Sequence, residues 1–132
     1  MKKPYITEAT RTTPMTCVDY KTGRVMVKGR SSPENTMEFY DPFLAAISEL
    51  GESDHRDIKA SFKLIYFNTS SARCIYLIVK ELKMLMEKGK NLTINWYAEE
   101  DDEDMIDTAM DFQDIIGIEF NIKIFSSSES LK

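Results

Sequence analysis

The chain alternates between two hydrophobic periods, and this alternation limits it to a fold in which strands and helices follow one another. Residues 57–67 place apolar side chains at every second position, which is the period of a half-buried strand. Residues 69–89 then place them three and four positions apart, as in a helix with one buried face, and Gly89 ends that pattern. Alternating strand and helix periods indicate an α/β fold.

The same two periods divide the rest of the chain. Residues 13–28 read as a hairpin that turns at Lys21-Thr22-Gly23, after an irregular opening segment. Because Pro42 interrupts the next helical pattern, we expect the main helix to begin at Asp41, with 33–40 as a separate turn or short helix. Further elements are expected at 91–97 (strand), 101–116 (helix) and 118–124 (strand).

This order of elements predicts the arrangement of the sheet. Successive strand-helix-strand units need right-handed crossovers and parallel neighbours, whereas the opening hairpin is antiparallel. We therefore expect an α/β domain over residues 1–125, with a mixed sheet of about five strands, an N-terminal hairpin, three main helices and a STAS-like order, followed by a frayed serine-rich tail over 126–132. Residues 64–67 are apolar without alternation, which predicts a central strand covered by helices on both faces.

Composition excludes several classes of protein. No cluster of Lys and Arg is interleaved with aromatic residues, so we do not expect nucleic-acid binding. No apolar run approaches about 18 residues and no signal-peptide pattern opens the chain, so we expect a cytoplasmic protein without direct membrane insertion. Cys17 and Cys74 are far apart and His55 is the single histidine, which leaves no zinc ligand set, and no metal or cofactor is expected.

Acidic residues are concentrated in one segment. The net charge is -5, and residues 99–114 carry nine acids and no bases. Acids at the start of a helix complement its dipole, which is the simplest interpretation of the run Glu99 to Asp104. A surface for a basic partner is the alternative, while the spacing of a calcium-binding loop is absent.

The segment Asn68-Thr69-Ser70-Ser71 lies where the best strand ends and the longest helix begins. Partners and ligands of open α/β sheets usually bind at this carboxyl edge. Hydroxyls at a helix start lie beside unsatisfied N–H groups, where a phosphate would be stabilised. The same residues are also ordinary N-caps, and Ser70 as a nucleophile is a third alternative, although it lacks a G-x-S-x-G frame. The residues alone leave these alternatives open.

Several segments resemble the SiaC family of bacterial regulatory phosphoproteins. They are Thr12-Thr13-Pro14, Ser32-Pro33-Glu34-Asn35, the run from Leu64 to Ser71, and Trp96-Tyr97 followed by the acidic helix. The resemblance spans nearly the whole chain. It implies that Thr69 is phosphorylated by a serine/threonine kinase with a histidine-kinase-like ATP-binding fold, and that a PP2C-type phosphatase removes the phosphate.

The resemblance also implies what the protein does. The unphosphorylated form is expected to bind and activate an effector, a diguanylate cyclase, in the control of cyclic di-GMP and biofilm, and the protein itself to catalyse nothing. We expect partner contacts around Thr69, from Asn68, Ser70 and Ser71, and from Glu34 and Asn35 ahead of the preceding helix. The alternative is a small-molecule-binding or hydrolytic domain that uses the Ser70 turn.

Overall fold

The structure, a computed structural model, describes residues 2–126 as one six-stranded sheet and three helices. The elements are β1 (Tyr5–Thr7), β2 (Met15–Asp19), β3 (Arg24–Ser31), α1 (Thr36–Gly51), β4 (Asp57–Phe67), α2 (Thr69–Glu87), β5 (Asn91–Glu99), α3 (Glu103–Ile116) and β6 (Asn121–Phe125). The predicted mixed α/β fold with an N-terminal hairpin and three helices is confirmed. The predicted tail lies outside the described residues, apart from Ser126.

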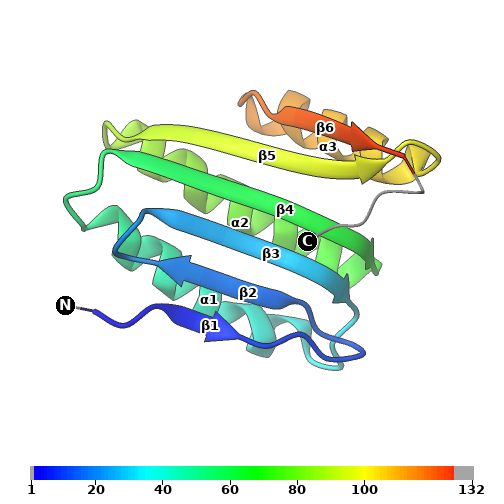
Figure 1. The fold of residues 1–132 in the computed structure, drawn as a ribbon, viewed down its shortest axis with the longest axis horizontal. Helices are drawn as coiled ribbons and strands as arrows, with labels where there is room; N and C mark the ends of the chain where they lie inside the picture. The colour runs from blue at the N-terminus through cyan, green and yellow to red at the C-terminus, as the bar shows by residue number, and fades with distance from the viewer. Residues whose placement is uncertain (1, 127–132) are drawn as a thin grey trace.

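Strand order follows the chain. Each strand pairs with its neighbour in sequence, in the order β1-β2-β3-β4-β5-β6 (Figure 1). The pairs β1–β2 and β2–β3 are antiparallel, whereas β3, β4, β5 and β6 run parallel. Three crossovers, through α1, α2 and α3, therefore advance across the sheet in one direction.

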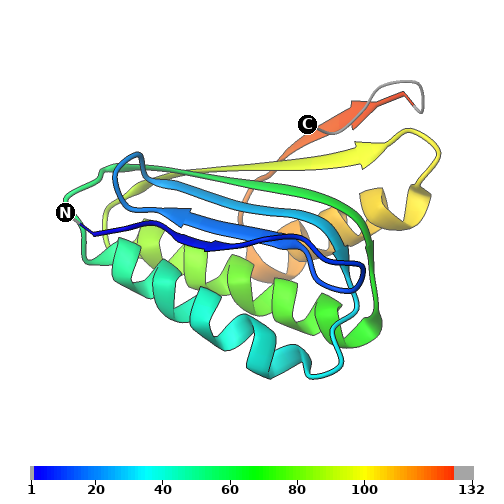
Figure 2. The same ribbon diagram turned by 60° about the horizontal axis from the view of Figure 1, so that its bottom comes forward.

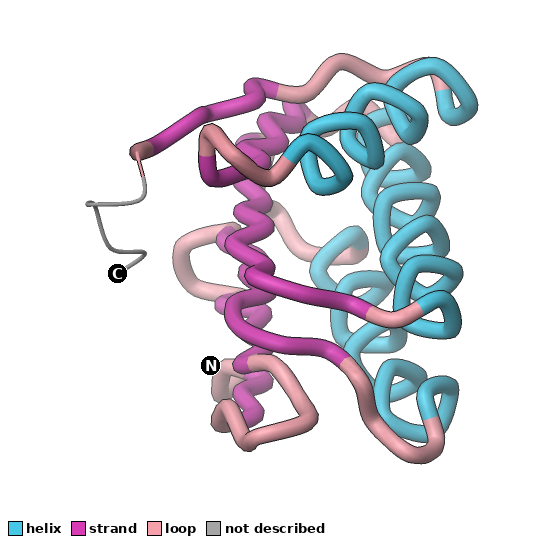
Figure 3. The backbone as a smooth tube through the Cα atoms, turned by 90° about the vertical axis from the view of Figure 1, so that its right-hand side faces the viewer, coloured by secondary structure: helices cyan, strands magenta, loops and turns pink. Residues whose placement is uncertain are grey.

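All three helices cover the same face of the sheet (Figure 2). Figure 3 looks along the sheet and shows the strands as one layer and the helices as a second. Crossovers of one hand that advance in one direction must place their helices on one face. The prediction that helices cover both faces is therefore wrong.

The end of β4 loses its alternation because of a β-bulge. Gly29 of β3 pairs with Leu64, and Arg30 pairs with Tyr66, so Ile65 is the extra residue. Ile65 is 55% exposed and Tyr66 is 43% exposed. The loss of alternation in residues 64–67 is thus caused by an inserted residue and not by burial on both faces.

The core lies between the sheet and the helices, and Trp96 of β5 is the largest of its fully buried side chains. The Trp96 ring is fully buried and stacks on Phe62 of β4 and on Phe120, with ring centroids 5.3 and 5.8 Å away. Phe112 of α3 meets the same ring edge-on at 6.1 Å. These contacts join α3 to β5 and, through Phe62, to β4.

The helix α1 is continuous through Pro42, so the predicted separate turn is wrong. Asn35 is its N-cap, and the Asn35 Oδ1 accepts a hydrogen bond from the Glu38 N–H at 3.2 Å. Tyr40 and Phe43, on either side of the proline, are both fully buried. Their packing offsets the backbone hydrogen bond that a proline cannot donate.

Two strands also differ from their predictions. The opening segment, expected to be irregular, forms β1, in which Tyr5 pairs with Val18 and stacks on Phe43 of α1. Three residues are too few for a periodic signal. The last strand begins at Asn121 rather than at residue 118.

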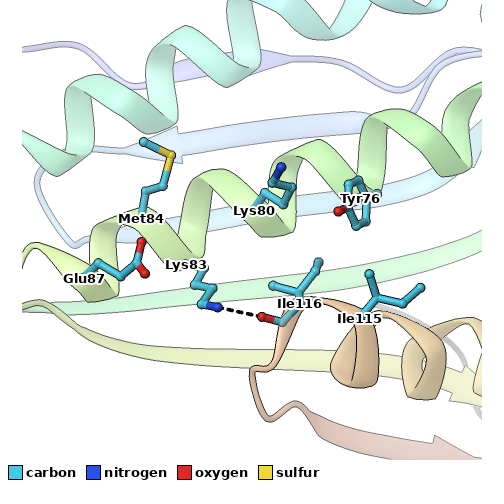
Figure 4. A pocket seen from close by; sticks show the side chains of 7 residues that line it. All are labelled: Tyr76, Lys80, Lys83, Met84, Glu87, Ile115 and Ile116. Carbon is cyan, nitrogen blue, oxygen red and sulfur yellow. Dashed lines mark hydrogen bonds between the residues drawn. The ribbon is translucent and has the colours of Figure 1, made fainter.

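The helices α2 and α3 are joined by a hydrogen bond at the end of α3. Lys83 donates from its Nζ to the carbonyl oxygen of Ile116 at 2.7 Å (Figure 4). This bond satisfies one of the carbonyls that every helix C-terminus leaves free. A hollow of about 270 Å³ lies between the two helices, lined by Tyr76, Lys80, Lys83, Met84, Glu87, Ile115 and Ile116.

The acidic segment leads into α3, which begins at Glu103 rather than at the predicted residue 101. Asp102 is the N-cap and accepts a hydrogen bond from the Met105 N–H at 3.1 Å, and Glu103 and Asp104 follow in the first turn. Carboxylates at these positions complement the helix dipole. Within residues 2–126, no helix is both long enough and apolar enough to cross a membrane.

One substitution tests the one-sided core. Phe62→Ala removes a fully buried ring from β4 and should lower the free energy of unfolding by about 3–5 kcal/mol. Urea unfolding followed by the fluorescence of Trp96, the single tryptophan, measures the loss. Ile65→Ala, on the same strand but more than half exposed, is the matched control and should change stability by less than about 0.5 kcal/mol. Equal losses would contradict the assignment of faces.

Candidate functional site

The candidate site is the edge of the sheet at which the parallel strands end. The arrowheads of β3, β4 and β5 all lie at the right-hand side of Figure 1. Each of these strands is followed directly by a helix, so α1, α2 and α3 all begin at this edge. Their N-caps are Asn35, Asn68 and Asp102. Ligands and partners of parallel sheets usually bind at such an edge.

Asn68 caps α2, which confirms the capping interpretation of this residue. Its Oδ1 accepts a hydrogen bond from the Ser71 N–H at 2.8 Å, and its carbonyl oxygen accepts one from the Ala72 N–H at 2.9 Å. Its own N–H donates to the carbonyl of Ser31, the last residue of β3, at 3.1 Å. The start of α2 is therefore anchored to the neighbouring strand.

Three buried hydroxyls form a hydrogen-bonded cluster below this turn. Ser71 donates from Oγ to the Ser31 carbonyl at 3.0 Å, and Ser31 donates from Oγ to the Ser71 Oγ at 2.8 Å. The Tyr40 hydroxyl lies 2.5 Å from the Ser31 Oγ, and because Ser31 has already donated its proton, Tyr40 is the donor. All three residues are 0% exposed. Every hydroxyl proton in the cluster is used.

Ser71 faces the core in this structure, whereas the sequence predicts a partner contact from it. Its side chain has no exposed surface and is fully occupied by Ser31. Sequence alone could not separate Ser71 from its neighbours, because Ser31 lies 40 residues earlier in the chain. Burial also raises the pKa of the Tyr40 hydroxyl to about 12, partly offset by its hydrogen bond to Ser31.

The other two hydroxyls of the turn are exposed. Thr69 and Ser70 both have exposed side chains in the first turn of α2. Ser70 lies at a hollow of about 680 Å³ to which Glu34 and Asn35 also contribute, so the structure brings these three predicted residues together. The rest of the lining comes from the starts of α1 and α2: Thr36, Met37, Arg73, Cys74 and Leu77.

A second hollow lies on the other side of the turn. It measures about 180 Å³ and is lined by the end of β4 and the start of α3: Ile65, Tyr66, Phe67, Asp102, Asp104, Met105 and Thr108. The smaller hollow includes Phe67, two residues before Thr69, and the larger one includes Ser70, the residue after it. Sequence reasoning missed this second surface, because the apolar residues at the end of β4 predict a strand covered on both faces.

Charges of both signs surround the turn. Arg73 lies one helical turn after Thr69, and the Arg30 guanidinium lies 4.9 Å from the centre of the Tyr66 ring, a cation–π contact. Asp102 and Asp104 line the same hollow as Tyr66, whereas Arg73 lines the hollow that includes Ser70. Among residues 2–126, no group of three His, Cys, Asp or Glu side chains could hold a metal ion.

Ser70 has no histidine beside it. His55, the single histidine, precedes β4, whereas Ser70 follows β4. An eleven-residue strand of about 3.3 Å per residue separates the two ends. His55 therefore cannot reach the Ser70 hydroxyl as a base.

Comparisons with known proteins identify the family. The chain matches the SiaC family regulatory phosphoproteins over residues 7–125, and it belongs to that family. An uncharacterized protein of Pseudomonas aeruginosa strain UCBPP-PA14 is 25% identical over 114 residues, which cover 86% of this chain and 90% of that protein.

Two solved structures show the same fold. The crystal structure of apo-SiaC from Pseudomonas aeruginosa superposes with a TM-score of 0.82 at 23% identity, over 92% of this chain and 99% of that one. The crystal structure of the diguanylate cyclase SiaD in complex with its activator SiaC, from the same organism, matches with a TM-score of 0.84 at 23% identity and the same coverage.

The buried tyrosine predicts how stability depends on pH. An unfolded tyrosine ionises near pH 10, whereas Tyr40 in the folded protein ionises at about 12. Because its pKa is higher in the folded protein, protonated Tyr40 stabilises the fold. This contribution to the free energy of unfolding is complete below about pH 10, and about 2–3 kcal/mol of it is lost as the pH rises toward 12. Urea unfolding of the wild type and of Tyr40→Phe across this range measures the difference. Parallel profiles for the two proteins would refute the assignment.

Proposed function

We propose that this protein is a signalling adaptor that catalyses nothing itself and is switched by reversible phosphorylation of Thr69. One observation carries the proposal: Thr69 is exposed in the first turn of α2, in a chain that belongs to a family of regulatory phosphoproteins. A phosphate there adds about -1.5 to -2 charges and three acceptor oxygens. The helix N-terminus stabilises that charge.

Two proposed partners change the phosphorylation state of Thr69. A kinase with a histidine-kinase-like ATP-binding fold adds the phosphate, and a PP2C-type phosphatase removes it, as the sequence resemblance implies. Glu34 and Asn35 serve as kinase contacts in this proposal, since both are exposed and border the hollow at which Ser70 lies. The location of this exchange is the cytoplasm.

The proposed output is activation of a diguanylate cyclase by the unphosphorylated form, in the control of cyclic di-GMP and biofilm. A solved relative, SiaC, is described as the activator of the cyclase SiaD. Large exposed apolar side chains flank the turn, namely Ile65 and Tyr66 on one side and Met37 on the other. A phosphate carried into an apolar interface must lose its water, so phosphorylation opposes effector binding.

The hollow beside Ser70 defines the competing function, a small-molecule-binding or hydrolytic domain. Its volume of about 680 Å³ falls within the usual range for ligand sites, about 300–1,000 Å³. A hydrolase using a Ser–His pair at Ser70 is disfavoured, because His55 lies at the far end of β4 from this hydroxyl. A thermal shift with a panel of metabolites, abolished by Leu77→Arg in the lining, would favour the ligand-binding alternative.

The first test is a mass measurement. Incubation with ATP and a kinase of the proposed histidine-kinase-like fold from the same organism should raise the intact mass by one phosphate, and Thr69→Ala should abolish the gain. Ser70→Ala, the matched control at the other exposed hydroxyl, should be phosphorylated normally. A gain that survives Thr69→Ala, or no gain in the wild type, would overturn the proposal.

The second test examines the kinase contacts. Alanine at both Glu34 and Asn35 should slow phosphate transfer, chiefly by raising the KM for this protein, because contacts used equally in binding and reaction affect KM more than kcat. Asp54→Ala, an acid before the start of β4, is the control and should leave transfer unchanged. Circular dichroism verifies that every variant is folded, and normal KM in the double variant would remove both residues from the docking surface.

A further inference from the structure

We infer that the buried hydroxyls of Ser31, Tyr40 and Ser71 are positioning groups that present Thr69, and not Ser70, to the kinase. The inference rests on the proposed function and deepens it, because it names what selects one acceptor from three consecutive hydroxyls. The cluster lies directly below the turn and links β3, α1 and α2 through bonds of 2.5–3.0 Å. None of its atoms is exposed to a partner.

Because of helix geometry, Thr69 must face outward when Ser71 is buried. Successive side chains of an α-helix are rotated by about 100° around its axis. Once Ser71 points into the core, Ser70 points sideways and Thr69, two residues back, points nearly away from the core. The observed positions agree: Ser71 is 0% exposed, Ser70 borders the hollow between α1 and α2, and Thr69 is exposed.

A single carbonyl holds both ends of the segment that contains the two exposed hydroxyls. The Ser31 carbonyl accepts from the Asn68 N–H at 3.1 Å and from the Ser71 hydroxyl at 3.0 Å. Asn68 precedes Thr69, and Ser71 follows Ser70. The rotation of the first turn of α2 is therefore set by the last residue of β3, rather than by the capping residue alone.

Tyr40 completes the cluster from α1. The Ser31 Oγ donates to Ser71 and accepts from Tyr40, so removal of the phenol hydroxyl leaves a buried Ser31 oxygen without its donor. An unpaired buried group favours conformations in which it meets water. Opening of the first turn of α2 lets water reach the Ser31 oxygen. In this open state the helix no longer fixes the different directions in which Thr69 and Ser70 point.

Phosphoryl transfer depends on this rotation. The Thr69 Oγ1 attacks the γ-phosphorus of ATP, the bond from that phosphorus to the bridging oxygen of ADP breaks, and the hydroxyl proton passes to a base of the kinase. The attacking and leaving oxygens must be roughly in line, so the kinase selects the hydroxyl that is held in position. A turn that opens presents Ser70 as well.

The test is the distribution of phosphate between the two exposed hydroxyls. Wild type, Tyr40→Phe and the matched control Tyr76→Phe, on the α2–α3 side, are phosphorylated by the kinase with ATP and analysed by tandem mass spectrometry. Hydrogen exchange of residues 68–72 is measured on the same proteins without kinase. Tyr40→Phe should shift phosphate from Thr69 toward Ser70 and speed exchange by about fivefold, the effect of one ordinary hydrogen bond on an opening equilibrium. Tyr76→Phe should change neither.

Each outcome separates this inference from the function on which it rests. Phosphate on Thr69 in the wild type, with the same distribution and exchange in Tyr40→Phe, overturns the positioning role and leaves the switch intact. A wild type without phosphate on Thr69 overturns the proposed function itself. Ser71→Ala is the second variant if Tyr40→Phe does not fold. If Ser71→Ala carries phosphate on Thr69 and Ser70 in the same proportion as the wild type, the inference is overturned. A lower melting temperature alone, without redistribution, marks a purely structural role and also overturns it.

Discussion

The arrangement of this molecule depends on crossovers of one hand that advance across the sheet in one direction. Because each strand from β3 to β6 is added beside the previous one, the three intervening helices pack on a single face. The carboxyl ends of three strands and the starts of three helices are thereby gathered at one edge. The two hollows beside Thr69 exist because β4 leads into α2 between the starts of α1 and α3.

The parts of this fold that sequence could predict have long or distinctive local signals. The eleven residues of β4 and the nineteen of α2 repeat their hydrophobic period several times, so their junction at Asn68 was placed correctly. The acids that begin α3 were predicted from the helix dipole. Phosphorylation of Thr69 stays a prediction, and it rests on the resemblance over several segments because local chemistry does not distinguish three neighbouring hydroxyls.

The parts that sequence could not predict depend on contacts between distant residues. Whether Ser71 faces the core or a partner is decided by Ser31, 40 residues away, and by Tyr40. Ile65 is exposed because it is the extra residue between the pairs Gly29–Leu64 and Arg30–Tyr66. The sequence of β4 alone does not indicate this pairing with β3. Pro42 predicts a helix boundary because the cost of a proline is local, whereas the packing of Tyr40 that offsets this cost depends on distant residues.

The geometry of the turn also restricts how a phosphate on Thr69 can act. Thr69 is the first helical residue after the cap, where a negative charge is favourable, so the modification is compatible with an intact α2. The bonds that anchor this end of the helix are made by Asn68 and Ser71, and neither uses the Thr69 hydroxyl. In the proposed switch the change is therefore one of surface: a phosphate on Thr69 adds a dianion to α2 just after the exposed Ile65 and Tyr66 in the chain, and it breaks none of these anchoring bonds. A partner that packs on those apolar side chains would lose its binding surface although the protein remains folded.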